Sequence, residues 1–192
     1  MKKIIALLLA IVMVLGLAAC GKKDDAGKSN EMTPEEKAFA EAEIRSALGL
    51  LLDRNYIVES VSQAGEKPAN TFVADGMADN KGGNFAANSN GGKGYFSVDK
   101  AEFQANFDKA MEVLKKYYEF DGTKFTNFPT LTYLYNTSEG HKAIGEYLQS
   151  AFAAVGINMT LVNQEWNTFL NTRKEGDYSI ARNGWLADYN DP

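Results

Sequence analysis

The sequence predicts an α/β fold in which a small parallel sheet alternates with helices. Residues 131–182 change repeatedly between short apolar runs typical of strands and segments with helical spacing. Hydrophobic residues make up 45% of the 192-residue chain and charged residues 23%, which is typical of a protein with a packed core. Strand–helix–strand units join parallel strands through right-handed crossovers, so we expect a parallel βαβαβ unit over residues 130–183.

The N-terminus predicts export. Lys2 and Lys3 precede a short apolar run that ends in Leu-Ala-Ala-Cys at residues 17–20, a pattern typical of a secretory signal peptide over residues 1–19. The last four residues resemble the lipobox of bacterial lipoproteins, which implies cleavage before Cys20 and lipidation of that residue. The alternative is a membrane anchor in which Cys20 is an ordinary apolar residue. Polar residues then predict a flexible tether up to residue 32.

Helices and a loop follow the tether. A capping box with proline at the first helical position, residues 33–36, predicts a helix over residues 34–53. Asn55 is expected to cap a second, short helix that ends at residue 61. Residues 65–94 are rich in Gly, Asn, Ala and Asp and have no steady period, so they predict a long loop.

The second half of the chain has clearer periodicity. Apolar residues at helical spacing predict a helix over residues 99–120, which Asp121-Gly122 ends. The further elements expected are strands over residues 131–135, 158–162 and 178–182, and helices over residues 141–155 and 165–173. Ligands of parallel sheets bind beyond the carboxyl ends of the strands. These ends carry Asn136, Asn163-Gln164 and residues 182–185.

Composition excludes several kinds of function. The net charge of -5 argues against a nucleic-acid partner, which would show a basic face. One cysteine and one histidine exclude a disulfide framework and a zinc site with several Cys or His ligands. Neither GxxxxGK[ST] nor GxGxxG is present. We therefore expect no cofactor and no metal.

Three stretches, residues 44–58, 133–142 and 163–189, resemble the oligopeptide-binding lipoproteins of bacterial ABC importers, in the extracytoplasmic solute-binding protein family 5 of peptide and nickel type. The third stretch, with Asn-Gln-Glu-Trp and later Ala-Arg-Asn-Gly-Trp, is the most specific. The resemblance implies part of a type II periplasmic-binding-protein-like fold. Family members are much longer, so residues 33–192 are expected to form an incomplete second lobe in a shortened chain that lacks most of the first lobe and the C-terminal end.

The resemblance also implies a peptide ligand, a membrane-embedded permease as partner and a set of binding residues. Asp188 resembles the family residue that receives the ligand's α-amino group, and Arg182 and His141 resemble residues near the ligand's carboxyl end. A peptide in a cleft needs such opposite charges, because unpaired charges there are costly. Pocket-lining residues of the family are matched by Trp166, Arg173 and Trp185.

Each candidate has an ordinary alternative. The alternative for Asp188 is a turn residue, for Arg182 a structural ion pair, for His141 a solvated helix position, and for either tryptophan a place in the core. Two other classes of protein also remain: a surface lipoprotein remnant that binds nothing, and a carboxylate-dependent hydrolase. No spacing of carboxylates fixes a catalytic pair, so we expect no enzyme.

Overall fold

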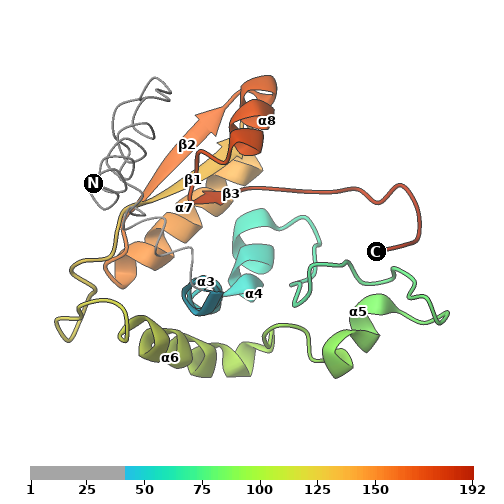
Figure 1. Ribbon diagram of the computed structural model, residues 1–192, viewed down its shortest axis with the longest axis horizontal. Coiled ribbons are helices and arrows are strands. Elements are labelled where there is room, and N and C mark those ends of the chain that lie inside the picture. The colour runs from blue at the N-terminus through green and yellow to red at the C-terminus, as the bar shows by residue number, and fades with distance from the viewer. Residues whose placement is uncertain (1–41) are drawn as a thin grey trace, which may run out of the picture. The chain divides into compact units, whose positions relative to one another are not determined.

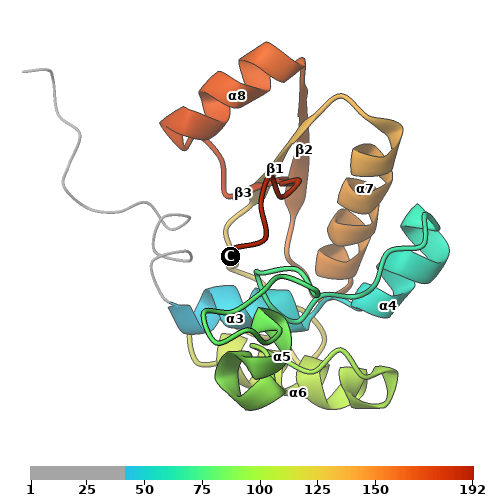
Figure 2. The ribbon, with the colours of Figure 1, turned by 90° about the vertical axis from the view of Figure 1, so that its right-hand side faces the viewer.

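A three-stranded parallel sheet with a helix on each face forms the centre of the structure (Figures 1 and 2). The computed structural model describes residues 42–192. The predicted signal peptide at residues 1–19, Cys20 and the tether up to residue 32 lie outside the described residues, as does the start of the first predicted helix. The chain divides into the units Met1–Met32 and Thr33–Pro192, and only the second is described below.

The sheet has the strand order β2-β1-β3, with β1 in the middle. The strands are β1 (Leu131–Asn136), β2 (Met159–Gln164) and β3 (Ile180–Ala181), and both neighbours run parallel to β1. Helix α7 (Glu139–Ala154) joins β1 to β2, and α8 (Trp166–Glu175) joins β2 to β3. Figure 2 shows α7 and α8 on opposite faces of the sheet. The predicted βαβαβ unit is therefore confirmed, and the carboxyl ends of all three strands share one edge.

The two faces of the sheet are buried differently. Alternate side chains of a strand point to opposite faces, so Tyr133 and Tyr135 share one face while Leu134 belongs to the other. The two tyrosines face α7 and stack, with ring centroids 5.7 Å apart. Leu134 and Phe169 of α8 are both fully buried but stand outside the main core cluster. The sheet therefore has a large core on the α7 side and a small separate one on the α8 side.

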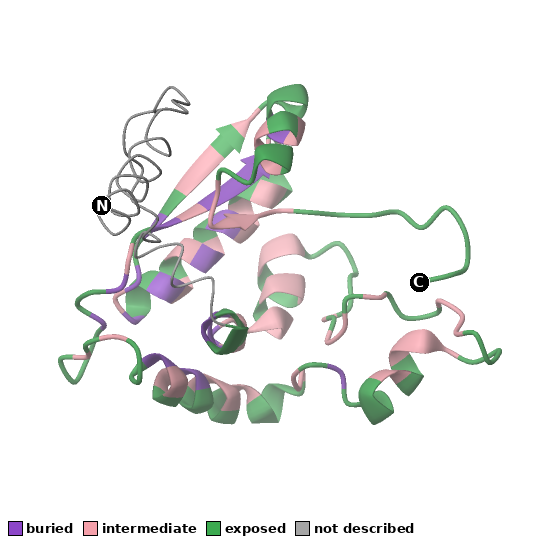
Figure 3. Ribbon diagram, in the orientation of Figure 1, coloured by how far each residue is buried: buried purple, intermediate pink, exposed green. Residues whose placement is uncertain are grey.

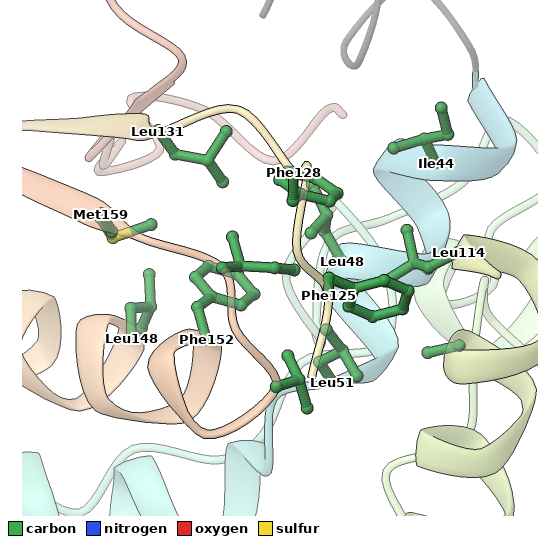
Figure 4. Close-up of a cluster of buried hydrophobic side chains, with 14 of the residues drawn as sticks. Ile44, Leu48, Leu51, Leu114, Phe125, Phe128, Leu131, Leu148, Phe152 and Met159 are labelled. Atoms are coloured by element: carbon green, nitrogen blue, oxygen red, sulfur yellow. The ribbon is translucent and has the colours of Figure 1, made fainter. Parts of the chain in front are cut away.

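The main core continues from the sheet to a pair of packed helices, α3 (Ala42–Leu50) and α6 (Phe103–Leu114) (Figures 3 and 4). Figure 4 shows apolar side chains from all three regions meeting in one cluster. Its labelled members are Ile44, Leu48, Leu51, Leu114, Phe125, Phe128, Leu131, Leu148, Phe152 and Met159.

Helix α6 is shorter than the sequence predicts. It ends at Leu114 rather than at residue 120, and residues 115–118 form turns. Phe120 instead pairs with Phe125 in an antiparallel bridge. The carboxylate of Asp121 accepts hydrogen bonds from the backbone N–H groups of Thr123 and Lys124, both at 2.7 Å, and so closes the turn between them. Aromatic pairing and turn chemistry therefore override helical spacing here.

The predicted first helix also ends early. Asp53, expected within it, instead caps the next helix by accepting hydrogen bonds from the backbone of Asn55 and Tyr56. That helix, α4 (Arg54–Tyr56), continues as the π-helix η1 (Ile57–Ser62). The prediction that Asn55 is the cap was wrong, because Asn55 lies inside the helix and its own N–H is one of the two that the Asp53 carboxylate accepts from.

The long loop over residues 65–94 contains two short helical pieces, α5 (Phe85–Asn88) and η2 (Ser89–Gly92), and a further turn, η3 (Lys100–Glu102), precedes α6. Within residues 42–192, no helix combines the length and the hydropathy of a membrane span.

Candidate functional site

The candidate ligand edge lies where the three parallel strands end. Ser138 follows β1 and caps α7, with its hydroxyl accepting from the backbone N–H of His141 at 3.5 Å. His141 is half-buried in the first turn of α7, and its Nδ1 lies 3.2 Å from the carbonyl oxygen of Asn136. The fold therefore anchors the His141 ring to the end of β1, rather than leaving it freely solvated.

Thr137 ties the ends of β1 and β2 together. Its backbone N–H donates to the carbonyl of Gln164 at 3.0 Å. Its hydroxyl donates to Oδ1 of Asn163 at 2.9 Å and lies 3.3 Å from a carboxylate oxygen of Glu165. The sequence placed Asn163 and Gln164 at a strand end, but it did not predict this role for Thr137. Its only signal was its position directly after β1.

Two side-chain oxygens at this edge have no partner within the described chain. They are Oδ1 of Asn136 and Oε1 of Gln164, both buried from solvent. The two residues are register partners at the last position of β1 and β2, so they lie on the same face, that of α8. A buried carbonyl oxygen without a donor is unfavourable by about 1–3 kcal/mol. This edge therefore has unused capacity for hydrogen bonds.

The helix face that carries the buried ring of Phe169 also carries Trp166 and Arg173, one on each side of that ring along the chain. Trp166 stacks on Phe169 with ring centroids 5.8 Å apart, and the Arg173 guanidinium lies 5.4 Å from the same ring. Arg173 also donates from Nη1 to Oδ1 of Asn183 at 2.7 Å. Helix α8 is thereby joined to the segment that follows β3.

Arg182 extends the pairing of β3, because its backbone N–H donates to the carbonyl of Leu134 at 2.8 Å. Its guanidinium lies over Gly184, where an added Cβ would come within 2.7 Å of Nη1. Burial raises the pKa of Tyr133, and the charge of Arg182 acts in the opposite direction. Within residues 42–192, no ion pair includes Arg182, so the structural alternative for this residue finds no support there.

The tryptophans are not core residues. Trp166 is 52% exposed and Trp185 is 82% exposed. Trp185 belongs to the segment over residues 183–192, which Figures 1 and 3 show leaving the sheet as an exposed, irregular chain. The core alternative is therefore wrong for both, and both rings are available for contact.

Asp188 lies in the same exposed segment, separate from the other candidates. No hydrogen bond or ion pair within the described part of the chain joins it to any of them. Farther along the segment, Oδ1 of Asn190 accepts a hydrogen bond from the backbone N–H of Ala78 at 2.7 Å. The structure therefore places His141, Trp166 and Arg182 after β1, β2 and β3 and joins Arg173 to the end of β3 through Asn183, while Asp188 and Trp185 lie in the exposed segment beyond.

Three pockets lined by described residues lie elsewhere. One adjoins Arg54 and Asn55, one lies beside Asp79 in the long loop, and one lies between Asn70 and Glu102. None of the three is lined by a candidate residue. Residues 42–192 also contain no group of three or more His, Cys, Asp or Glu side chains that could hold a metal ion.

Comparisons with known proteins show the family of the chain. Residues 26–192 match the model of the bacterial extracellular solute-binding proteins, family 5 Middle. The chain is 35% identical over 165 residues to the periplasmic oligopeptide-binding protein OppA of Salmonella typhimurium, which covers 84% of this chain and 27% of that protein.

Solved structures agree. The murein tripeptide binding protein MppA of Escherichia coli superposes with a TM-score of 0.64 at 27% identity, over 84% of this chain and 28% of that one. Haemophilus influenzae OppA in complex with RPPGFSPFR superposes with a TM-score of 0.61 at 26% identity, over 84% of this chain and 28% of that one. The predicted type II periplasmic-binding-protein-like fold is thus confirmed. This chain spans about a quarter of the length of the curated relatives it matches, and it belongs to the bacterial extracellular solute-binding proteins of family 5.

Proposed function

We propose that this chain carries part of an extracytoplasmic binding site for peptides, which the membrane-embedded permease of an ABC importer then takes up. The observation that carries the proposal is the carboxyl edge of the sheet in a family 5 fold. His141 and Arg182 follow β1 and β3 with an imidazole and a guanidinium group, Arg173 contacts Asn183 after β3, and the unpartnered oxygens of Asn136 and Gln164 lie at the ends of β1 and β2. Parallel α/β sheets bind their ligands beyond this edge.

The charges at the edge suit a peptide. Arginine pairs a carboxylate bidentately, so Arg182 or Arg173 fits the ligand's carboxyl end. Asp188 is the proposed partner of the ligand's ammonium group. It lies on an exposed segment without a bond to the other candidates, so binding requires this segment to approach the sheet. Exposed Trp166 and Trp185 supply apolar contact for peptide side chains.

Family 5 solute-binding proteins are components of transport and are not enzymes. We propose the same for this chain, with the protein held outside the cytoplasm by a lipid on Cys20. Several acyl chains bury enough methylene groups to make such anchoring durable. If the mass of the mature protein shows no acyl group at Cys20, the proposed lipid anchor is wrong, and the proposal of peptide binding is unaffected.

Calorimetry with unmodified and N-acetylated tripeptides to pentapeptides tests the binding proposal. Asp188→Asn removes a charge-assisted contact at constant size, so it should weaken binding roughly ten- to a hundredfold. Acetylation of the peptide should weaken binding by a similar factor, and the two losses should not add, because both remove the same ion pair. Asp191→Asn is the matched control, since it makes the same charge change three residues farther along.

The outcomes separate the alternatives. Equal loss in Asp188→Asn and Asp191→Asn would remove Asp188 from its role, and so would equal affinity for free and acetylated peptides. Heat from neither form would support the remaining alternative, a surface lipoprotein that binds no peptide by itself.

A further inference from the structure

The chain contains two Asn-Gly pairs, Asn90-Gly91 and Asn183-Gly184. Glycine after asparagine matters chemically because no Cβ hinders the approach of the glycine nitrogen to the asparagine side chain. That nitrogen can attack the side-chain carbon Cγ and expel ammonia. The two pairs have very different surroundings in the structure, so the reaction rate at one can be compared with the rate at the other in the same chain.

At Asn183 the side chain is folded back over the following peptide. The backbone N–H of Gly184 donates to Oδ1 of Asn183 at 3.0 Å. The attacking nitrogen therefore lies beside the amide that it would attack, and this hydrogen bond opens as the nitrogen loses its proton and turns toward Cγ.

Arg173 completes this arrangement. Its Nη1 donates to the same Oδ1 at 2.7 Å. A donor 2.7–3.1 Å from a carbonyl oxygen stabilises the negative charge that develops there when a nucleophile attacks. Both Asn183 and Gly184 are exposed, so the water needed for the second step has access.

Asn90 has none of these features. Its side chain is half-buried and uses its amide nitrogen as a donor to the carbonyl of Gly94 at 2.7 Å. Its backbone is held in the left-handed region at φ 51°. The Asn90 amide is therefore held through its leaving nitrogen, whereas the Asn183 amide has the Arg173 donor on the oxygen where negative charge develops.

We propose that Asn183 is a site of spontaneous deamidation promoted by Arg173. The Gly184 nitrogen forms a bond to Cγ of Asn183 and gives up its proton, while the bond from Cγ to Nδ2 breaks and ammonia leaves. Water then adds to either carbonyl of the resulting succinimide ring. Ring opening yields aspartate or isoaspartate, so the net change is one water consumed and one ammonia released.

The product alters the edge of the sheet. Aspartate places a carboxylate at the position from which the neutral amide contacted the Arg173 guanidinium. In isoaspartate the former side-chain carbonyl joins the main chain, the free carboxylate is the former main-chain carbonyl group, and a methylene is added to the main chain just before Gly184. The modification therefore neutralises one cation of the edge and shifts the path of the segment that carries Asp188.

Peptide mapping by mass spectrometry tests the proposal on the full chain, incubated folded at neutral pH and in parallel in concentrated urea. In the folded chain Asn183 should deamidate roughly two- to fivefold faster than Asn90, because Asn183 is exposed and has the Arg173 donor on its side-chain oxygen. Arg173→Met should slow Asn183 roughly two- to fivefold, as expected for an exposed charged contact, without changing Asn90. In urea the two sites should react at similar rates, and Arg173→Met should have no effect.

Lys174→Met is the matched control, because it removes a neighbouring cation that makes no contact with Asn183, and it should leave both rates unchanged. A folded chain in which Asn90 reacts as fast as Asn183 would overturn the inference. An unchanged Asn183 rate in Arg173→Met, or an equal slowing in Lys174→Met, would overturn the role of Arg173.

Discussion

Gly145 lies where α7 packs most closely against the sheet. It is buried in the middle of the helix, facing the ring of Tyr133 on β1. A Cβ added there would lie 3.0 and 3.1 Å from two ring carbons of Tyr133 and 3.3 Å from a methyl carbon of Leu161. The Tyr133 ring cannot readily move away, because it is 96% buried and stacks on Tyr135. Glycine is therefore a packing requirement at this position.

Two opposing effects decide the result of Gly145→Ala. Alanine is favoured over glycine inside a helix by about 0.5–1 kcal/mol. Forcing an extra methyl group into a filled core is unfavourable by about 1–3 kcal/mol. The close contacts with Tyr133 favour the second effect, so we expect a net loss of about 0.5–2 kcal/mol in the free energy of unfolding.

Gly140→Ala in the same helix is the matched control. The nearest atom to an added Cβ there is Oγ of Ser138, at an ordinary 3.9 Å, so only the helix preference remains and the protein should become more stable. Urea denaturation followed by circular dichroism measures both variants against the parent. A denaturation midpoint that rises in Gly145→Ala as it does in Gly140→Ala would refute the close packing of α7 on β1.

Three further outcomes follow from the structure. Phe152→Ala should lower the free energy of unfolding by about 3–5 kcal/mol, because Phe152 is only 1% exposed, while Trp185→Ala, at 82% exposed, should change it by less than about 0.5 kcal/mol in the same urea titration. Tyr147→Phe should lower the free energy of unfolding by about 1–2 kcal/mol, because the Tyr147 hydroxyl accepts from the backbone N–H of Asp53 at 2.9 Å and its removal leaves that N–H without a partner. An unchanged urea midpoint would contradict this. Backbone hydrogen bonds from Lys124 and Thr123 lower the pKa of Asp121, so its contribution is present above the unfolded pKa of about 3.9 and is lost as the pH falls through the lower folded value. Asp121→Asn should therefore show a smaller loss of stability between about pH 5 and pH 2 than the parent, and an identical pH profile would contradict it.

The alternation of helices and strands was predictable because it depends on the local spacing of apolar residues along the sequence. Helical and strand periods change several times after residue 130, and the crossover rule then leaves a parallel sheet as the expected result. Boundaries were less predictable. The end of α6 at Leu114 depends on the pairing of Phe120 with Phe125, which are five residues apart and belong to no common period.

The site was only partly predictable for a related reason. The positions of Asn136 and Gln164 at the ends of strands were predicted correctly, since this needs only the strand pattern and the chain direction. It does not give side-chain partners, so the bonds of Thr137 and the contact between Arg173 and Asn183 were not predicted. Asp188 follows β3 in the sequence but does not lie at the carboxyl edge of the sheet, because residues 183–192 have no regular pairing with the sheet.

The two helices that carry candidate residues are held unequally, and this bears on how the edge works. Helix α7 buries three residues, Gly145, Leu148 and Phe152, against a core that continues to α3 and α6. Helix α8 buries only Phe169, which packs in the small core on the other face. Regions with few buried apolar contacts open locally at lower free energy than the global transition. The position of His141 on α7 is therefore held rigidly by the main core. The position of Arg173 on α8 depends on the single buried ring of Phe169 and on the hydrogen bond to Asn183. A ligand or a modification that competes for Arg173 thus acts on the part of the edge that is most easily rearranged.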